Sequence, residues 1–97
     1  MKNAMENNTG SLPSKEQVIE TVIDIFVRVI GFIEREEVFP TTDVGKDFYI
    51  DGDDLSFFAE EVEKHFGINA PQEEWFNIGG TMEEIADLVL RHLSKKP

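Results

Sequence analysis

The residues whose types most suggest chemistry are three aspartates around one glycine, Asp51, Asp53 and Asp54. Closely spaced carboxylates suggest calcium first. An EF-hand loop needs oxygen ligands at alternating positions, a central glycine at the sixth position and a glutamate at the twelfth. Counted from Asp51, those two positions hold Ser56 and Val62. The pattern therefore predicts no metal site, and the aspartates are expected to cap the start of a helix and face its positive end.

The other candidates for catalysis are the two histidines, His65 and His92, since the chain has no cysteine. Nucleophilic or acid–base catalysis needs a nucleophile, a base and a group that orients the base. The sequence around either histidine shows no such set, so we expect both to occupy surface or boundary positions. Gly79 and Gly80 are not followed by the Lys-Ser/Thr pair of a phosphate-binding loop. We therefore predict that the chain is not an enzyme.

A helix is predicted well before the aspartates. Ser14 and Gln17 form a capping-box pair, which predicts that a helix begins after Ser14. Apolar residues then recur at helical spacing, and the helix is expected to end near Glu34. These residues are Val18, Val22, Ile25, Phe26, Val29, Ile30 and Ile33, with Ile19, Ile23, Val27 and Phe32 widening the stripe. Residues 1–13 lack this period and predict a disordered tail ahead of one helical domain over residues 14–97.

The second predicted helix carries the acidic cluster. It begins near Asp53, and Gly67 is its natural C-terminal stop. Its narrow apolar stripe consists of Leu55, Phe58, Ala59, Val62 and Phe66. On the opposite face Glu60 and Lys64 are four residues apart and are expected to pair. Phe57 lies on this outward face too, where it is either an exposed docking residue or packs against the loop before the helix.

The remaining segments complete an all-α fold. Residues 35–52 predict a long ordered loop. A short helical turn after Pro71, over residues 72–77, carries Trp75 and Phe76, which are expected to cover one end of the core. A second capping box, Thr81 with Glu84, predicts the start of the last helix. The expected architecture is a bundle of three main helices and one short helix, with the long loop between the first two main helices.

The charge of the chain narrows the choice of partner. Twenty acidic residues against nine basic ones give a formal net charge of −11. Such a chain repels the phosphates of nucleic acids and anionic lipid surfaces, so we expect neither nucleic acid nor membrane as a partner. A protein with a basic patch is the expected partner, although acidity can also serve solubility alone. No apolar run is long enough to span a bilayer, and a cytoplasmic location is expected by default.

Three segments resemble parts of acyl carrier proteins. Residues 63–71, EKHFGINAP, look like the end of that family's second helix, typically E-x-x-F-G-I-x-I-P. Residues 81–89, TMEEIADLV, look like its final helix, typically T-V-G-D-L-V-D-Y-I. Asp47 and Phe48 resemble the acidic–hydrophobic pair in the family's long loop. The resemblance extends over residues 14–93 and implies the helical bundle described above.

The family's function depends on a serine in a D-S-L motif, which carries a phosphopantetheine arm holding acyl or aminoacyl groups as thioesters. Counting back without gaps from Phe66-Gly67-Ile68 places the motif's serine on Gly52, which has no hydroxyl. The resemblance thus implies a carrier-like protein without the arm and without another cofactor. It also implies that the acidic second helix docks on a partner protein. The residues expected to bind the partner are Asp51, Asp53, Asp54, Phe57, Glu60, Glu61 and Glu63.

Two alternatives stay open. The chain could be a working acyl or aminoacyl carrier whose phosphopantetheine is attached to Ser56, with an acyl chain held in the core. Against this, a serine inside a helix commonly bonds a backbone carbonyl of the preceding turn. The chain could also be a small acidic chaperone or regulator of a basic partner, for which the low isoelectric point is the only support.

Overall fold

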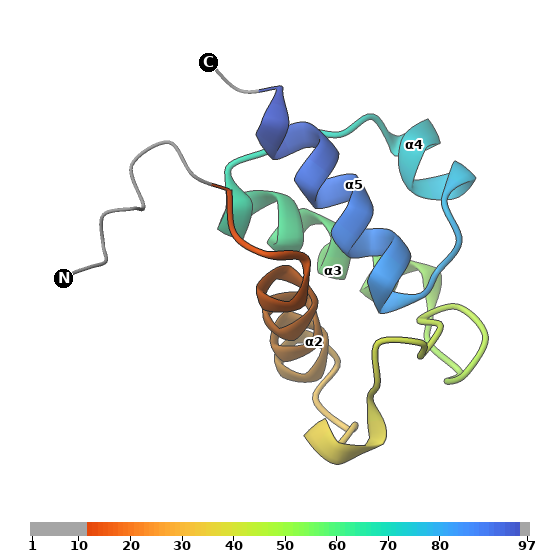
Figure 1. Cartoon of the computed structure of the whole chain (residues 1–97). Helices are drawn as coiled ribbons and strands as arrows, with labels where there is room; N and C mark the ends of the chain where they lie inside the picture. Colours follow the sequence, from red (N-terminus) through yellow and green to blue (C-terminus); the bar gives the residue numbers. More distant parts are fainter. Residues whose placement is uncertain (1–11, 96–97) are drawn as a thin grey trace, which may run out of the picture.

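The long helix near the N-terminus supports the rest of the fold. In the computed structural model, which describes residues 12–95, three long helices and one short helix follow one another, with a single 3-10 turn in the long loop (Figure 1). The elements are α2 (Lys15–Ile30), η1 (Arg35–Glu37), α3 (Gly52–Phe66), α4 (Gln72–Asn77) and α5 (Met82–Ser94). This confirms the predicted all-α bundle and its long loop, whereas the predicted tail lies almost entirely outside the described residues.

Helix α2 begins where the capping box predicts. The Gln17 backbone N–H donates to Ser14 Oγ at 3.1 Å, and the Ser14 N–H donates to Gln17 Oε1 at 2.9 Å. The helix ends at Ile30, one turn before the predicted end near Glu34, because Gly31 adopts a left-handed conformation with φ 87°. Phe32, expected to widen the apolar stripe, therefore lies beyond the helix and is 65% exposed.

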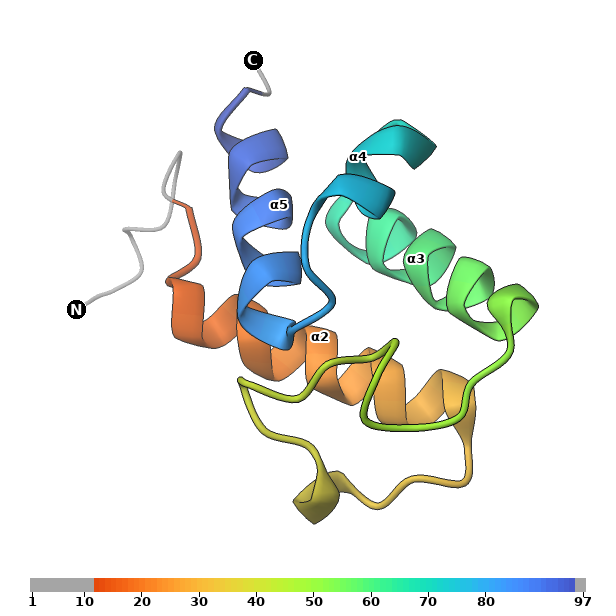
Figure 2. The same ribbon diagram turned by 90° about the vertical axis from the view of Figure 1, so that its right-hand side faces the viewer.

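The core lies where α2, α3 and α5 meet (Figure 2). Phe26 of α2 packs edge-on against Phe58 of α3, with ring centroids 5.3 Å apart, and both rings are almost fully buried. From the last helix Ile85, Leu88 and Val89 close the same core. Burying one such side chain is worth about 1.5–3 kcal/mol, so these three helices hold each other in place.

The long loop over residues 31–51 is attached to the bundle at two places, one on α2 and one at the start of α5. At η1, Arg35 pairs with Glu20 and with Asp24 of α2, the latter at 3.1 Å. Further on, buried Thr42 accepts the Met82 N–H through its carbonyl at 3.1 Å. A β-bridge between residues 43 and 81 adds to this contact. The loop is thereby ordered, as predicted, and fixes the N-terminus of α5.

The start of α5 and the lengths of the helices complete the description of the fold. Glu84 and Thr81 form the predicted capping box of α5, with the Glu84 N–H donating to Thr81 Oγ1 at 3.1 Å. Within residues 12–95, the helices are all too short or too polar to cross a lipid bilayer.

Candidate functional site: the acidic helix and the groove beside it

Helix α3 begins one residue before the predicted start, at Gly52, with Asp51 as its N-cap residue. The carbonyl of Asp51 accepts the Leu55 N–H at 3.0 Å, but its carboxylate makes no capping hydrogen bond. The expectation that this aspartate caps through its side chain is therefore wrong. Asp53 and Asp54 lie exposed in the first turn, where their negative charges interact favourably with the positive end of the helix dipole.

Gly52 occupies an open position. A Cβ built on this residue would meet no atom within 4 Å, and its φ is not positive. Neither close packing nor backbone conformation therefore requires a glycine here. The residue is exposed and has no hydroxyl, so it offers no oxygen for a phosphodiester bond.

Ser56 lies one helical turn after Gly52, and both residues line the same groove. Its side chain is exposed. Within residues 12–95 its hydroxyl takes part in no hydrogen bond, so the expected bond to a backbone carbonyl is absent. The oxygen is thus accessible from solvent.

The carboxylates of α3 divide into engaged and free groups. Glu61 contacts Arg28 Nη1 of α2 at 3.8 Å and Lys64 Nζ at 3.3 Å, and its side chain is only 16% exposed. Lys64 therefore pairs with Glu61 and not, as predicted, with Glu60, since Glu61 lies between two cations. Glu63 accepts a hydrogen bond of 2.7 Å from Trp75 Nε1.

The free group comprises the acidic side chains that make no ion pair or hydrogen bond with another residue in the described range. Its members are Asp51, Asp53, Asp54 and Glu60, and all four are exposed. Phe57 lies among them with 51% of its surface exposed and is not packed against the core, which favours the exposed alternative over packing against the loop. Five of the seven predicted partner-binding residues are therefore accessible on α3.

A groove of about 520 Å³ separates α3 from α4. Its floor is apolar and includes Phe58, Ala70 and Ile85. The α4 wall carries Trp75, which is partly buried, and Phe76, which is 75% exposed. The expectation that both aromatics cover the core is therefore right for the tryptophan and wrong for Phe76.

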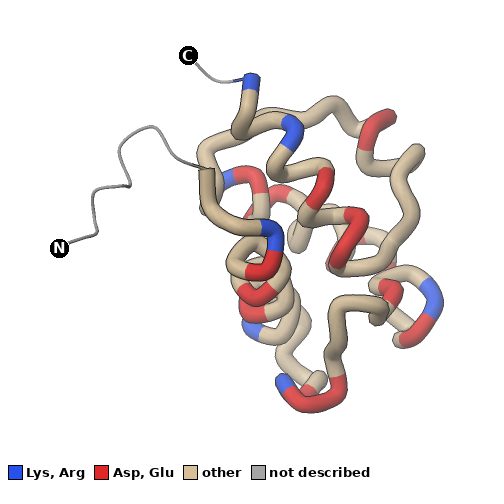
Figure 3. Tube along the Cα trace, in the orientation of Figure 1, with Lys and Arg blue, Asp and Glu red and all other residues tan. Residues whose placement is uncertain are grey.

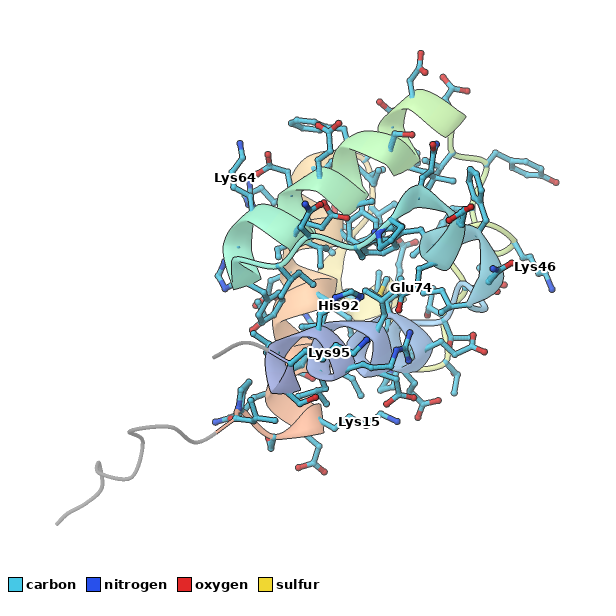
Figure 4. The ribbon with its side chains drawn as sticks, turned by 90° about the horizontal axis from the view of Figure 1, so that it is seen from above. Lys15, Lys46, Lys64, Glu74, His92 and Lys95 are labelled. Carbon is cyan, nitrogen blue, oxygen red and sulfur yellow. The ribbon has the colours of Figure 1, made fainter. Side chains whose placement is uncertain are left out.

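Polar contacts of two α4 residues, Glu74 and Trp75, hold the α4 wall in place. Besides the Trp75–Glu63 hydrogen bond to α3, Glu74 Oε2 accepts from Arg91 Nη2 of α5 at 2.7 Å. Glu74 Oε1 lies 2.7 Å from His92 Nε2, and Figure 4 shows these two side chains pointing toward each other from α4 and α5. The hydrogen bond from Arg91, followed by that from His92, lowers the pKa of Glu74 below its ordinary value of 4.5. The groove is thus preformed.

The histidines occupy the kinds of position expected of them. His92 is mostly buried at the boundary between α4 and α5, where it bridges the two helices. His65 is exposed and its ring contacts the neighbouring Phe66 ring, with centroids 4.9 Å apart. Over residues 12–95, no group of three or more His, Asp or Glu side chains is arranged to hold a metal ion.

Acidic residues are spread over the helices and the long loop, as Figure 3 shows along the chain trace. Among residues 12–95, the charged side chains that line the groove are Glu60 and Glu63, so its lining charge is entirely negative. Sequence reasoning found the acidic residues of α3 but missed the groove. The lone Trp75 in a short polar helix was the one signal that pointed to it.

The three long helices, the short α4 and the long loop between α2 and α3 match the layout that the resemblance to acyl carrier proteins implies. Comparison with known proteins agrees. The chain is 31% identical over 78 residues to the acyl carrier protein of Rubrobacter xylanophilus, an alignment that covers 80% of this chain and 94% of that protein. The chain therefore belongs to the acyl carrier protein family. No protein-family model matches it.

Proposed function

We propose that this chain is a member of the acyl carrier protein family that works without a phosphopantetheine arm, as a protein-binding module. The observation that carries the proposal is Gly52, the first residue of α3, where the family resemblance puts the arm-bearing serine. The position is exposed and has room for a side chain, so the fold does not require a glycine here and does not account for the missing hydroxyl. Membership of a carrier family also favours a role other than catalysis.

The proposed binding surface is the exposed face of α3. Asp53, Glu60 and Phe57 combine free carboxylates with a half-exposed aromatic ring. Charge attracts and orients a basic partner, while an aromatic residue supplies apolar contact area. The expected partner is a protein with a basic patch, and the net charge of −11 opposes binding to nucleic acid or anionic lipid.

The first test is intact mass after co-expression with a broad-specificity phosphopantetheinyl transferase. We expect the native chain to keep its unmodified mass. The matched control is Gly52→Ser with Asp53→Leu, which introduces the family's motif at an open position and is expected to gain one phosphopantetheine. A gain of the arm by the native chain would overturn the proposal.

The second test addresses partner binding. Immobilised native chain is compared with Asp53→Lys/Glu60→Lys and with a control of equal charge change, Glu16→Lys/Glu36→Lys, located on α2 and η1. Glu61 is left unchanged because its reversal would disrupt the contact with Arg28. A partner retained by native chain and control but lost with the α3 variant is expected, whereas equal retention by all three would count against α3.

A second candidate function rests on Ser56. Its exposed hydroxyl has no hydrogen-bond partner within residues 12–95 and lies at the same groove as Gly52, one turn along α3. If the native chain is loaded in the mass experiment, Ser56→Ala should abolish loading. The chain would then be a working carrier, with the groove available to its acyl group.

A further inference from the structure

We propose that the groove between α3 and α4 receives a bulky apolar side chain from a basic segment of the partner protein. The inference rests on the proposed function, because it specifies the chemistry of the partner that α3 binds. It predicts a cationic sequence that contains at least one leucine- or phenylalanine-like residue.

The shape and lining of the groove require the apolar part of this partner. Its floor is formed by core residues such as Phe58 and Ile85, and Leu55 and Ala59 line the α3 side. A volume of about 520 Å³ exceeds the needs of a single apolar side chain. Residues that dominate binding at interfaces are characteristically bulky side chains that fill such pockets.

The charges at the groove select the flanking residues of the partner. In the described part of the chain, residues 12–95, Glu60 is exposed and makes no ion pair, Glu63 lines the same groove, and no lysine or arginine lines it. The carboxylate of a fatty acid entering here would face like charge, whereas a lysine or arginine beside the apolar side chain would be attracted. The groove therefore favours a basic peptide over an anionic lipid chain.

The groove also needs little rearrangement to bind. Its α4 wall is fixed to α3 by the Trp75–Glu63 hydrogen bond and to α5 by the contacts of Glu74 with Arg91 and His92. A preformed pocket avoids much of the ordering cost of association. Phe76, 75% exposed on this wall, offers further apolar surface to an inserted side chain.

The test uses the chain's one tryptophan, Trp75, as a reporter inside the groove. Three capped peptides without tryptophan are titrated against the full chain. The first is Lys-Lys-Ala-Leu-Phe-Ala-Lys-Lys, the second replaces Leu and Phe by Ala, and the third replaces every Lys by Glu. We expect the first peptide to change Trp75 fluorescence and to bind about tenfold more tightly than either of the others.

Three variants localise the binding. Ala59→Phe fills the groove from α3, and Phe76→Ala removes an exposed wall residue that contributes little to folding. Glu60→Lys reverses the charge at the groove, with Glu36→Lys as its matched control on the distant η1 turn. The first three are expected to weaken binding of the first peptide several-fold, and the control is expected to leave it unchanged. Melting curves verify that each variant is folded.

The outcomes separate this inference from the proposed function. Equal binding of the first two peptides, insensitive to Ala59→Phe and Phe76→Ala, would overturn the groove inference while leaving electrostatic docking on α3 intact. Decanoate, titrated in the same way, represents an anionic lipid chain. Equal or tighter binding of the Glu-flanked peptide, or of decanoate, would overturn the requirement for a basic partner. Absence of binding by all peptides overturns the inference, and the affinity-capture experiment then decides independently whether α3 binds a protein.

Discussion

Replacing Gly52 by alanine tests whether the fold needs this glycine. The position is the first residue of α3, its φ is not positive, and an added Cβ would meet no atom within 4 Å. Under these conditions alanine only reduces the freedom of the unfolded chain and improves helix propensity. We expect Gly52→Ala to stabilise the domain by about 0.5 kcal/mol, which raises Tm by about 2–4 °C for a chain of this size.

The matched control is Gly31→Ala. A Cβ on Gly31 would likewise meet no atom within 4 Å, but the residue has a φ of +87°. In that conformation a side chain costs about 1–2 kcal/mol, so this variant should lower Tm. Thermal unfolding followed by circular dichroism measures both. Destabilisation by Gly52→Ala similar to that of Gly31→Ala would refute the reasoning, because Gly52 would then be a structural requirement and no evidence about the missing arm.

Three further predictions concern the core and the groove wall. Phe58→Ala should cost about 3–5 kcal/mol in chemical denaturation, since the ring is buried at the centre of the bundle. The lowered pKa of Glu74 means that its contacts stabilise the fold at pH values above 4.5 and that this contribution is lost as the pH falls through the lowered value. Glu74→Gln should therefore flatten the acid side of the stability–pH curve, and an unchanged curve would contradict the assignment. Glu63→Gln should shift Trp75 emission by weakening its hydrogen bond, with little change in Tm.

Local signals in the sequence predicted most of the fold. The two capping boxes mark the starts of α2 and α5, and Gly67, with φ 67°, ends α3 as expected. The same logic should have ended α2 at Gly31. However, Phe32 and Ile33 continue the apolar period past the glycine, although they belong to the loop. Periodicity alone therefore extended the helix by one turn.

The site was less predictable because its geometry depends on long-range contacts. The sequence spacing suggested that Lys64 pairs with Glu60, yet Arg28, far away in the sequence, draws Glu61 into a three-residue cluster. The groove likewise depends on the placement of α4, which Glu74 and Trp75 set through partners on two other helices. A six-residue helix has too little periodicity for its orientation to be inferred.

The acidic residues of α3 do not all call for a functional explanation. Asp53 and Asp54 favour the helix through its dipole, and Glu61 and Glu63 have structural partners. Phe57 has no such explanation, since it is half exposed and outside the core.

Glu60 differs from the other free carboxylates, because it is far from the N-terminus of α3 and cannot favour the helix through its dipole. Within residues 12–95 it is exposed and makes no ion pair or hydrogen bond. If Phe57 and Glu60 serve to bind a partner, Phe57→Ser and Glu60→Gln should each change the free energy of unfolding by less than about 0.5 kcal/mol, as surface substitutions usually do. Each should nevertheless weaken the partner complex measured by affinity capture. A loss of stability at Phe57 without loss of binding would show that this ring serves packing, and the docking surface would then have to lie elsewhere.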